Sequence, residues 1–448
     1  MKILKFGGAV LRRASDFTHI AEILRHEAAG GQALVIVSAL AATTRLLEQA
    51  AQQSQSGNDS EAAATLDSVI ATHSALVDEL MPGNEQVTLL IEDTRQRVAG
   101  LLRGVRITGE LTPRTLDHII SYGEYLALHI MHRFLADHEC DAGIVESTDV
   151  IITDAHHGAA TPQRNATAQR VDGILRPAFA SCPIVLMQGF VARSEHGDIT
   201  TMGKESSNLT ASLMGELLRA NDVVIYTDVE GVQTADPKLG ITGTQPIRQM
   251  SYAQAYHAAV NGVKLLYPTM IEPLRRAGIR LVIRSLQKPD GGATVVSALP
   301  DLDARALVTM MTDISTVRLV FPSVETRNSA DTIVARLFPD ATHILLRRDA
   351  PDSMWIAATH PPKTNGIHLM QTEGVAISAH AGIVLVTVIG SAQPVWSMMR
   401  GNLAEFLGDT AVQVIDSGAD DGIIRILVHP HHAEATVRSL HAQILRSA

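Results

Sequence analysis

The amino-terminal part of the chain alternates short aliphatic runs with segments of helical periodicity, and this alternation constrains the fold most. The run Ile3–Phe6 ends in Gly7–Gly8, and a helical pattern over 17–24 follows before the second run, Ala33–Val37. Strands joined by helices pair in parallel, because each helix returns the chain to the same end of the sheet. The pattern predicts an α/β domain with a mainly parallel central sheet and helices on both faces. Further strands are predicted at 143–145, 151–152, 184–187, 223–226 and 280–283.

Helices are predicted to dominate between the second and third strands. The stretch Glu61–His138 has helical periodicity, with breaks expected near Pro82–Gly83 and at Gly104. The polar stretch Gln52–Ser60 before it is predicted to be a loop.

The pattern changes near residue 300, after the turn-rich stretch Gln287–Gly292. From there on, two passes of similar element order follow one another, which predicts two small β-α-β-β units. The first pass has a strand at 317–320, a helix at 326–337 and strands at 343–347 and 354–358. The second has a strand at 383–389, a helix at 395–407, strands at 411–415 and 423–428, and a helix at 432–445.

Composition excludes several classes of partner. A chain of 448 residues is long enough for two or three domains, and its formal charge of −10 lacks the basic excess of a nucleic-acid-binding protein. Its two cysteines, Cys140 and Cys182, are too few for a disulfide framework and favour a reducing cytoplasm. The longest apolar run, Gly382–Gly390, is too short for a bilayer helix, and we expect neither a signal peptide nor a membrane segment.

Two stretches have the residues of a phosphate site. Lys5 lies near the end of the first strand, and the backbone of Gly7–Gly8 can approach phosphoryl oxygens closely. The polar loop Gly197–Thr210 brings hydroxyl groups and a lysine to a helix start, where anions bind. An ordinary strand-to-helix turn is the alternative for the first stretch, and a plain helix cap at Ser206 or Ser207 is the alternative for the second.

A third stretch, Thr227–Lys238, follows the strand at 223–226. Ligands of open α/β sheets bind at the carboxyl ends of the strands, so Asp228 and Lys238 are candidates for ligand contacts. The cluster His429–His432 suggests a metal site, but no carboxylate or cysteine accompanies it, and a solvated helix start is the better interpretation. We therefore assign no metal bound by protein side chains.

Taken together, these stretches resemble the aspartate kinases of the amino-acid kinase superfamily. The resemblance rests on the order and spacing of seven motifs. They are Lys5–Gly8, Ser38–Ala39 with Thr44, Ser121–Glu124, Gln188–Phe190 with Thr200–Gly203, Thr227–Lys238, Ser251–Tyr252, and Gly262–Lys264 with Pro268. The tail resembles the paired ACT domains through which such kinases sense end-product amino acids. The resemblance implies an amino-acid kinase domain over 1–299 and two α+β ACT domains over 300–375 and 376–448.

The resemblance also implies roles for individual residues. Lys5, Gly8 and Asn208 would be catalytic, with Lys5 and the glycine backbone stabilising the transferring phosphoryl group. Aspartate would be bound by Thr44, Glu124, Lys204 and Ser207, with Glu124 on the α-ammonium and Lys204 on a carboxylate. ATP would be bound by Gly7, Ser38, Thr227, Asp228, Gln233, Lys238 and Lys264. For Glu124 the alternative is a solvated carboxylate in the first turn of a helix.

Four departures from the family's pattern bear on these roles. Ala9–Val10 replaces a Thr-Ser pair, Lys204 replaces an arginine, Gln233 replaces a common tyrosine, and Asn208 stands where the family has its catalytic aspartate. The β-carboxyl group of an aspartate substrate is already ionised at neutral pH, so its attack on phosphorus needs no general base. We therefore expect Asn208 to orient Lys5 through a hydrogen bond and the chain to be active.

The implied activity is ATP-dependent phosphorylation of L-aspartate to 4-phospho-L-aspartate, the first step toward lysine, threonine and methionine. Mg²⁺ would arrive with ATP, held mainly by its phosphates. We expect an amino-acid effector at the ACT domains, a homodimer or higher homo-oligomer, a cytoplasmic location and no fused dehydrogenase. Two alternatives stay open: a kinase of another amino-acid carboxylate, and a catalytically weak amino-acid sensor.

Overall fold

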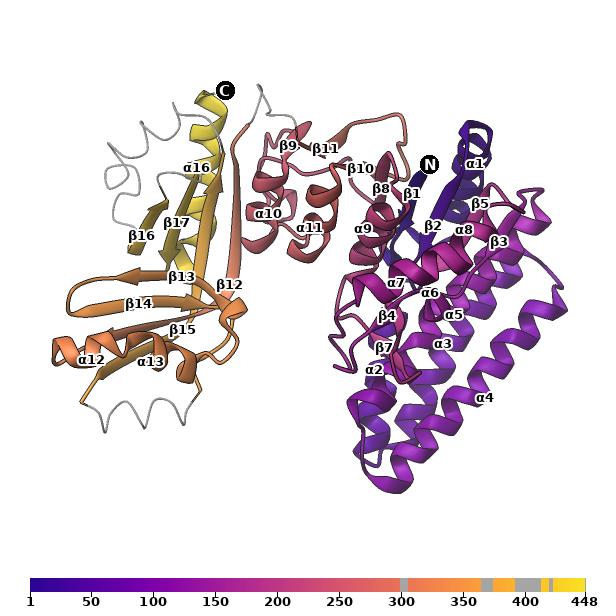
Figure 1. Cartoon of the computed structure of the whole chain (residues 1–448), viewed down its shortest axis with the longest axis horizontal. Coiled ribbons are helices and arrows are strands. Elements are labelled where there is room, and N and C mark those ends of the chain that lie inside the picture. The colour runs from indigo at the N-terminus through magenta and orange to yellow at the C-terminus, as the bar shows by residue number, and fades with distance from the viewer. Residues whose placement is uncertain (299–304, 364–373, 391–411, 419–421, 448) are drawn as a thin grey trace. The chain divides into compact units, whose positions relative to one another are not determined.

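The computed structural model describes residues 1–298, 305–363, 374–390, 412–418 and 422–447 (Figure 1). The chain divides into two compact units. The first unit comprises Met1–Gly231 and Thr269–Leu299, and the second comprises Val232–Pro268 and Pro300–Ala448. The boundaries expected at 299 and 375 stay predictions about domain organisation.

The first unit is built on a mainly parallel sheet, which confirms the predicted α/β class. The strands β3, β5, β2, β1, β8 and β10 pair in parallel in that order, and β11 joins β10 antiparallel. The central strands are buried along their whole length because helices cover both faces. The strands are β1 (Lys2–Phe6), β2 (Ala33–Val37), β3 (Ala142–Ile144), β5 (Ile184–Gln188), β8 (Asp222–Thr227), β10 (Arg280–Ser285) and β11 (Ala293–Ser297).

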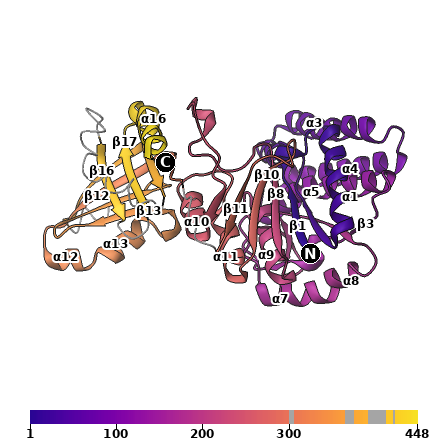
Figure 2. The same cartoon turned by 90° about the horizontal axis from the view of Figure 1, so that it is seen from above.

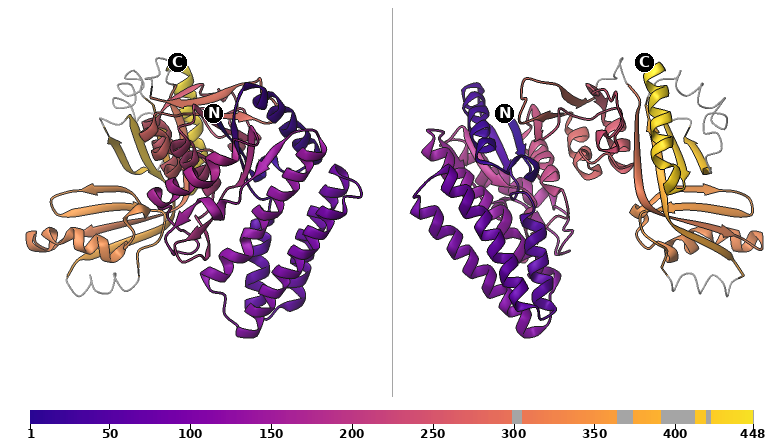
Figure 3. Two further views of the ribbon diagram at one scale, coloured as in Figure 1. Left: turned by 45° about the vertical axis from the view of Figure 1, so that its right-hand side comes forward. Right: turned by 180° about the vertical axis from the view of Figure 1, so that it is seen from behind.

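Helices α1 and α5 lie on one face of this sheet and α9 on the other (Figure 2). Gly215 of α9 allows the close approach, because a Cβ there would lie 2.7 Å from Val223 Cγ2 on β8. The long helices α3, α4 and α5, drawn in purple, lie side by side in the first unit (Figure 3). The helices are α1 (Ala14–Gly30), α2 (Thr43–Gln55), α3 (Asp59–Leu80), α4 (Glu85–Thr108), α5 (Pro113–Asp137), α6 (Ser147–Val150), α7 (Arg164–Arg170), α8 (Arg176–Ala178), α9 (Ser206–Leu218) and α11 (Pro268–Ala277). A small sheet of β4 (Ile152–Thr153), β6 (Val191–Ser194) and β7 (Ile199–Thr201) accompanies them.

Two local predictions in the helical region are wrong. The stretch Gln52–Ser60 is not one loop, because α2 continues to Gln55 and α3 begins at Asp59. Helix α4 runs through Gly104 to Thr108 and is capped by Gly109, which has φ 68°. A glycine inside a helix costs only about 1 kcal/mol, and the buried face of α4 offsets that cost. The predicted break at Pro82–Gly83 is confirmed.

The second unit contains a mixed α+β structure around an antiparallel sheet, and the predicted element order of the tail is confirmed where the structure describes it. The strands run in the order β13, β14, β12, β15, β17, β16, so the long central strands β12 and β15 join both passes into one sheet. The helix expected at 395–407 lies outside the described residues. The strands are β9 (Gln249–Ser251), β12 (Leu307–Val320), β13 (Ile344–Asp349), β14 (Ser353–Ala358), β15 (Ala376–Ile389), β16 (Val412–Gly418) and β17 (Ile423–Val428). The helices are α10 (Tyr252–Val260), α12 (Val324–Asn328), α13 (Ala330–Leu337) and α16 (Pro430–Ser447).

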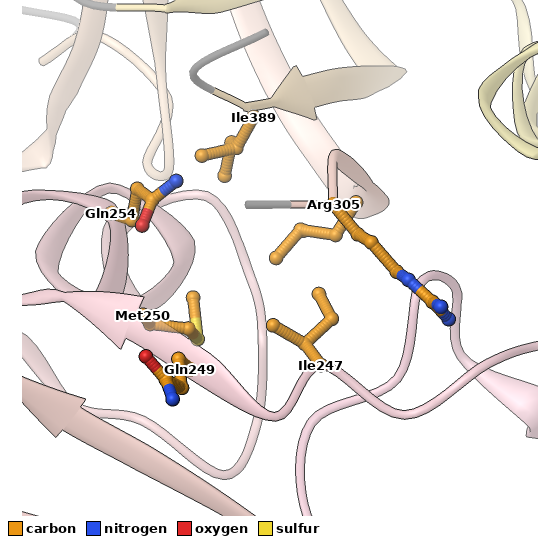
Figure 4. A pocket seen from close by; sticks show the side chains of 7 residues that line it. Ile247, Gln249, Met250, Gln254, Arg305 and Ile389 are labelled. Atoms are coloured by element: carbon orange, nitrogen blue, oxygen red, sulfur yellow. The ribbon is translucent and has the colours of Figure 1, made fainter. Parts of the chain in front are cut away.

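Three hydrophobic clusters lie among the described residues of this unit. One packs α13 against β12 and β14, a second packs α16 against β12, β15 and β17, and a third joins side chains of β12, β13, β14, β15 and β17. A small pocket lies where β9 and the start of α10 meet the ends of β12 and β15, and Ile247, Met250 and Ile389 point toward it (Figure 4). No helix among the described residues is long and apolar enough to span a membrane.

Candidate active site

Lys5 is a buried lysine on the central strand of the parallel sheet. It pairs with Ile36 on β2 and Ile225 on β8, and its side chain is 6% exposed. Burial lowers the pKa of Lys5 to about 8, and the carboxylates of Glu205 and then Glu124 oppose this shift. At neutral pH the site therefore holds a largely protonated ammonium group in a region from which water is excluded.

The glycines after β1 make room for this ammonium group. A Cβ on Gly7 would lie 2.5 Å from Lys5 Nζ, so the lysine folds back over Gly7 and leaves no space for a side chain there. A Cβ on Gly8 would lie 3.1 Å from the carbonyl oxygen of Ala39, so the backbone after β1 passes close to the end of β2. The geometry is that of a glycine loop around a fixed cation.

Glu124 lies on α5 beside the same strand ends. Its side chain is 4% exposed, and Oε1 accepts a hydrogen bond from the Ala39 amide at 3.2 Å. Oε2 is buried and has no hydrogen-bond partner among the described residues. Burial raises the pKa of Glu124 to about 8, against the opposing effects of backbone amides and Lys5. The alternative of a solvated first-turn carboxylate is wrong, because Glu124 is buried in the middle of α5.

The first turn of α9 brings Ser206, Ser207 and Asn208 to the site region. All three are buried, and Ser206 Oγ and Asn208 Oδ1 have no hydrogen-bond partner among the described residues. The hydrogen bond expected from Asn208 to Lys5 is therefore not formed in this structure. A Cβ on Gly189, at the end of β5, would lie 2.6 Å from Ser207 Cβ, so glycine is required for β5 to approach α9 this closely.

Glu205, immediately before α9, was not among the predicted site residues. It has φ 62° and ψ 11°, a left-handed conformation that costs a non-glycine residue about 1 kcal/mol. Its carboxylate is the stronger of the two that raise the pKa of Lys5. The only sequence signal was an acidic residue one position ahead of an anion-binding helix start.

The remaining predicted residues of the first unit lie at or near the same edge of the sheet. Thr227 ends β8 and donates its hydroxyl to Asp228 Oδ1 at 3.2 Å. Ser38 follows β2 directly, and its hydroxyl is buried without a hydrogen-bond partner among the described residues. Thr44 is half-buried in the first turn of α2, and Lys204 is exposed before α9.

Gln233, Lys238 and Lys264 belong to the second unit. Gln233 forms an isolated β-bridge with Pro246, and the Lys238 amide donates to Asp236 Oδ1 at 2.9 Å. The side chains of Lys238 and Lys264 are exposed.

Asp117, one turn ahead of Ser121 on α5, anchors a loop that sequence reasoning did not single out. It is 1% exposed and accepts hydrogen bonds from the Gly158 amide, from Thr201 Oγ1 and from His157 at 2.8 Å. In the sequence, the available indication was that Asp117 lies seven residues before Glu124, which places both carboxylates on one face of a helix. Because all its bonds are satisfied, Asp117 is a structural residue that fixes the loop beside β7.

The comparisons with known proteins agree with this geometry. Residues 1–285 match the model of the amino acid kinase family. The chain is 28% identical to lysine-sensitive aspartokinase 3 of Escherichia coli K12, over 66% of this chain and 63% of that protein. It is 25% identical to the chloroplastic aspartokinase 1 of Arabidopsis thaliana, over 99% of this chain and 80% of that protein.

Other relatives are longer. The match to the chloroplastic bifunctional aspartokinase/homoserine dehydrogenase 2 of Arabidopsis thaliana, at 26% identity, spans 67% of this chain but only 32% of that protein. The chain thus covers about a third of the length of such bifunctional relatives.

The fold has a solved counterpart. The crystal structure of E. coli aspartokinase III in complex with aspartate and ADP covers 99% of this chain and 100% of its own, with a TM-score of 0.88 at 22% identity. The parallel sheet, the glycine loop after β1 and a family match over well over half of the residues lead to one conclusion: this chain belongs to the amino acid kinase family.

Proposed function

We propose that the chain is an aspartate kinase that transfers the γ-phosphoryl group of ATP to the β-carboxylate of L-aspartate. One observation carries the proposal: four buried polar atoms at or near the carboxyl edge of the parallel sheet have no hydrogen-bond partner among the described residues. They are Ser38 Oγ, Glu124 Oε2, Ser206 Oγ and Asn208 Oδ1. A buried polar atom without a partner costs about 1–3 kcal/mol, so a region with four of them is suited to a polar ligand that supplies the bonds.

Glu124 gives the region its preference for an amino acid. Its unpartnered Oε2 is available to an α-ammonium group, and binding that group would favour the ionised carboxylate over the neutral acid present below pH 8. Thr44, Lys204 and Ser207 would bind the remaining groups of aspartate.

The chemical step needs positioning and charge stabilisation more than proton transfer. A carboxylate oxygen of aspartate attacks the γ-phosphorus, the bond from that phosphorus to the β,γ-bridging oxygen breaks, and ADP leaves with the electron pair. No proton moves, because the attacking carboxylate is ionised. Lys5 and the backbone of Gly8 would stabilise the negative charge on the transferring group.

The ATP site is a proposal that rests on the sequence motifs. Gly7, Ser38, Thr227 and Asp228 lie at the ends of β1, β2 and β8, where nucleotides bind in open α/β sheets. The sequence motifs also assign Gln233, Lys238 and Lys264 to ATP binding. Mg²⁺ would be held mainly by phosphate oxygens and water, and would neutralise phosphate charge.

The antiparallel sheet of the second unit supports regulation by an amino acid. We propose a kinase domain over 1–299 and ACT domains over 300–375 and 376–448, an effector derived from aspartate, a homo-oligomer and a cytoplasmic location. Aspartokinase 3 of E. coli is lysine-sensitive, and that protein's sensitivity makes lysine the first effector to test here.

A second candidate function is an amino-acid sensor with weak activity. Asn208 in place of the family's aspartate, without a bond to Lys5, is the observation that favours it. Ala9–Val10 leaves open a third, a kinase of another carboxylate.

One assay separates the three. Hydroxylamine traps acyl phosphates as hydroxamates, and we expect a product with ATP and L-aspartate but not with glutamate or N-acetylglutamate. The Lys5→Met variant is the matched control, because it should form product at least about 100-fold more slowly. If a hydroxamate formed only with another substrate, that substrate would take the place of aspartate in the proposal. If an amino acid bound but no hydroxamate formed with any substrate, the chain would be a sensor.

A further inference from the structure

The segment Gln233–Gly243, which carries two of the proposed ATP-binding residues, is built into the core of the second unit. The amide of Val308 on β12 donates to the carbonyl oxygen of Thr234 at 2.8 Å. The Thr234 amide in turn donates to the carbonyl oxygen of Gln245 at 2.9 Å. The segment is therefore a closed loop whose base is fixed to the antiparallel sheet.

The apolar side chains of this loop pack against the last helix of the chain. Ala235 is 2% exposed and Ile241 is 7% exposed, and both belong to the cluster that α16 forms with the sheet. The α16 residues in this cluster are Ala433, Val437, Leu440 and Ile444. At the far end of the loop, a Cβ on Gly243 would lie 3.7 Å from Leu445 Cδ1. Helix α16 thus contacts the loop along its length.

A polar contact also joins the loop to α16, between two residues that are 207 positions apart in the sequence. Thr234 Oγ1 lies 2.8 Å from His441 Nε2, and the two side chains are 0% and 2% exposed. Thr234 Oγ1 also accepts a hydrogen bond from the Gln245 amide at 2.9 Å. The threonine hydroxyl can donate its proton to His441 Nε2 in the tautomer that leaves this nitrogen unprotonated, and burial lowers the pKa of His441 from its usual value, which favours the neutral ring.

We infer that His441 is a positioning residue for nucleotide binding, acting through Thr234 on the loop that carries Gln233 and Lys238. The inference rests on the proposed function, because the role of this loop in binding ATP comes from it. The imidazole fixes the rotamer of Thr234, and Thr234 fixes the Gln245 amide that closes the loop. Without His441, the buried Thr234 hydroxyl keeps the Gln245 amide but loses its second partner, and the loop can adopt other conformations.

A second buried contact anchors the segment that leads to Lys264. Asn261 ends α10 and is 1% exposed, and its Oδ1 accepts from Thr387 Oγ1 and from Arg425 Nε, each at 3.2 Å. Its Nδ2 donates to the carbonyl oxygen of His257 at 2.8 Å. The turn bearing Lys264 is therefore attached to β15 and β17, as the loop bearing Lys238 is attached to α16.

The test compares nucleotide binding with fold stability in the full chain. His441→Leu removes the acceptor, and His441→Gln keeps an acceptor oxygen. We expect His441→Leu to raise the Kd for ADP and the KM for ATP by about tenfold while kcat and the KM for aspartate stay within about twofold. His441→Gln should recover most of the affinity. Thr436→Val is the matched control, because it removes a buried hydroxyl from α16 that, among the described residues, donates to the His432 carbonyl oxygen of the same helix.

Amide hydrogen exchange gives a readout that needs no nucleotide. In His441→Leu the amides of Thr234 and Gln245 should exchange faster, with those of β17 unchanged. If His441→Leu does not fold, Thr234→Val, with Thr234→Ser as its control, tests the same contact. Unchanged ADP affinity and unchanged exchange overturn the inference. If ADP does not bind to the wild type, the proposed function fails instead, and the exchange data still report on the contact.

Discussion

Buried polar groups at the carboxyl edge of the parallel sheet differ in their hydrogen bonding from those at Thr234 and Asn261, the two anchor points in the core of the second unit. At the sheet edge, Glu124 Oε2 and Asn208 Oδ1 are buried without a partner among the described residues, and Lys5 lies against Gly7. In the second unit, Thr234 and Asn261 have their side-chain oxygens fully engaged. Both arrangements are buried, so burial alone does not distinguish them. Unsatisfied groups leave room for a ligand to supply bonds, whereas satisfied groups hold the architecture.

The largest expected effect comes from removing the buried cation. Lys5→Met should lower kcat by at least about 100-fold with little loss of stability, because the ammonium group acts on the charge of the transition state and is costly to bury. Steady-state kinetics and thermal melting measure the two quantities. A variant with full turnover would remove Lys5 from the mechanism.

A slightly smaller effect is expected from filling the space under the lysine. Gly7→Ala places a Cβ 2.5 Å from Lys5 Nζ and must displace the ammonium group, so kcat should fall by about 30-fold. Gly100→Ala is the matched control, because a Cβ there meets nothing within 4 Å. Equal kinetics for the two variants would show that the position of the ammonium group is not critical.

The pH dependence of turnover tests the pair Lys5 and Glu124. Glu124, with its pKa raised to about 8, must ionise to bind an ammonium group, so the KM for aspartate should fall about tenfold per pH unit between pH 6 and 8 and then level off. Lys5, with its pKa lowered to about 8, loses its proton above that pH, so kcat should fall there. Glu124→Gln should have a high KM that no longer changes with pH. A flat KM profile in the wild type would mean that Glu124 does not bind the substrate's ammonium group.

Asn208→Asp should change kcat by less than about tenfold in either direction. An aspartate in the first turn of α9 gains from the helix dipole and from Lys5, but it adds repulsion toward the phosphate and the incoming carboxylate. If the wild type were inactive and Asn208→Asp raised kcat by orders of magnitude, the amino-acid sensor would be the better proposal for this chain. That outcome would also mean that unsatisfied polar groups at this edge do not indicate catalysis.

His73 tests the limit of the comparison, because its Nε2 is buried without a partner among the described residues, on α3, a helix that carries no proposed site residue. Burial lowers its pKa below 6.5, so it contributes stability that is present above pH 6.5 and is lost as pH falls. His73→Leu should therefore reduce the loss of stability between pH 7 and 5, by at most about 1.4 kcal/mol per pH unit. Thermal melts across pH measure this, with the exposed His196→Leu as control. Equal pH profiles for the wild type and His73→Leu would show that the pKa of His73 is the same in the folded and unfolded states.

Local patterns determined most of the secondary structure. The strand-loop-helix order, the glycine loop after β1 and the two passes of the tail follow from periodicities of a few residues, which depend on near neighbours. The helix break predicted at Gly104 was wrong because that prediction also used only local sequence. A glycine inside a helix has a small energetic cost, and packing along α4 outweighs it. The order of motifs also placed Lys5, Thr227 and Asp228 at one edge, because parallel strands end on the same side.

The tertiary structure alone decided which groups meet and which are left without partners. The amide oxygen of Asn208 has no hydrogen-bond partner among the described residues, so the bond expected to Lys5 is not formed. No residue near Asn208 in the sequence indicates this, because the position of Lys5 relative to Asn208 depends on the folded chain. The attachment of the Gln233–Gly243 loop to the last helix depends on Thr234 and His441, which are 207 positions apart. A hydrogen bond between such distant residues has no periodicity to detect, because only the folded chain brings its two atoms within 2.8 Å of each other.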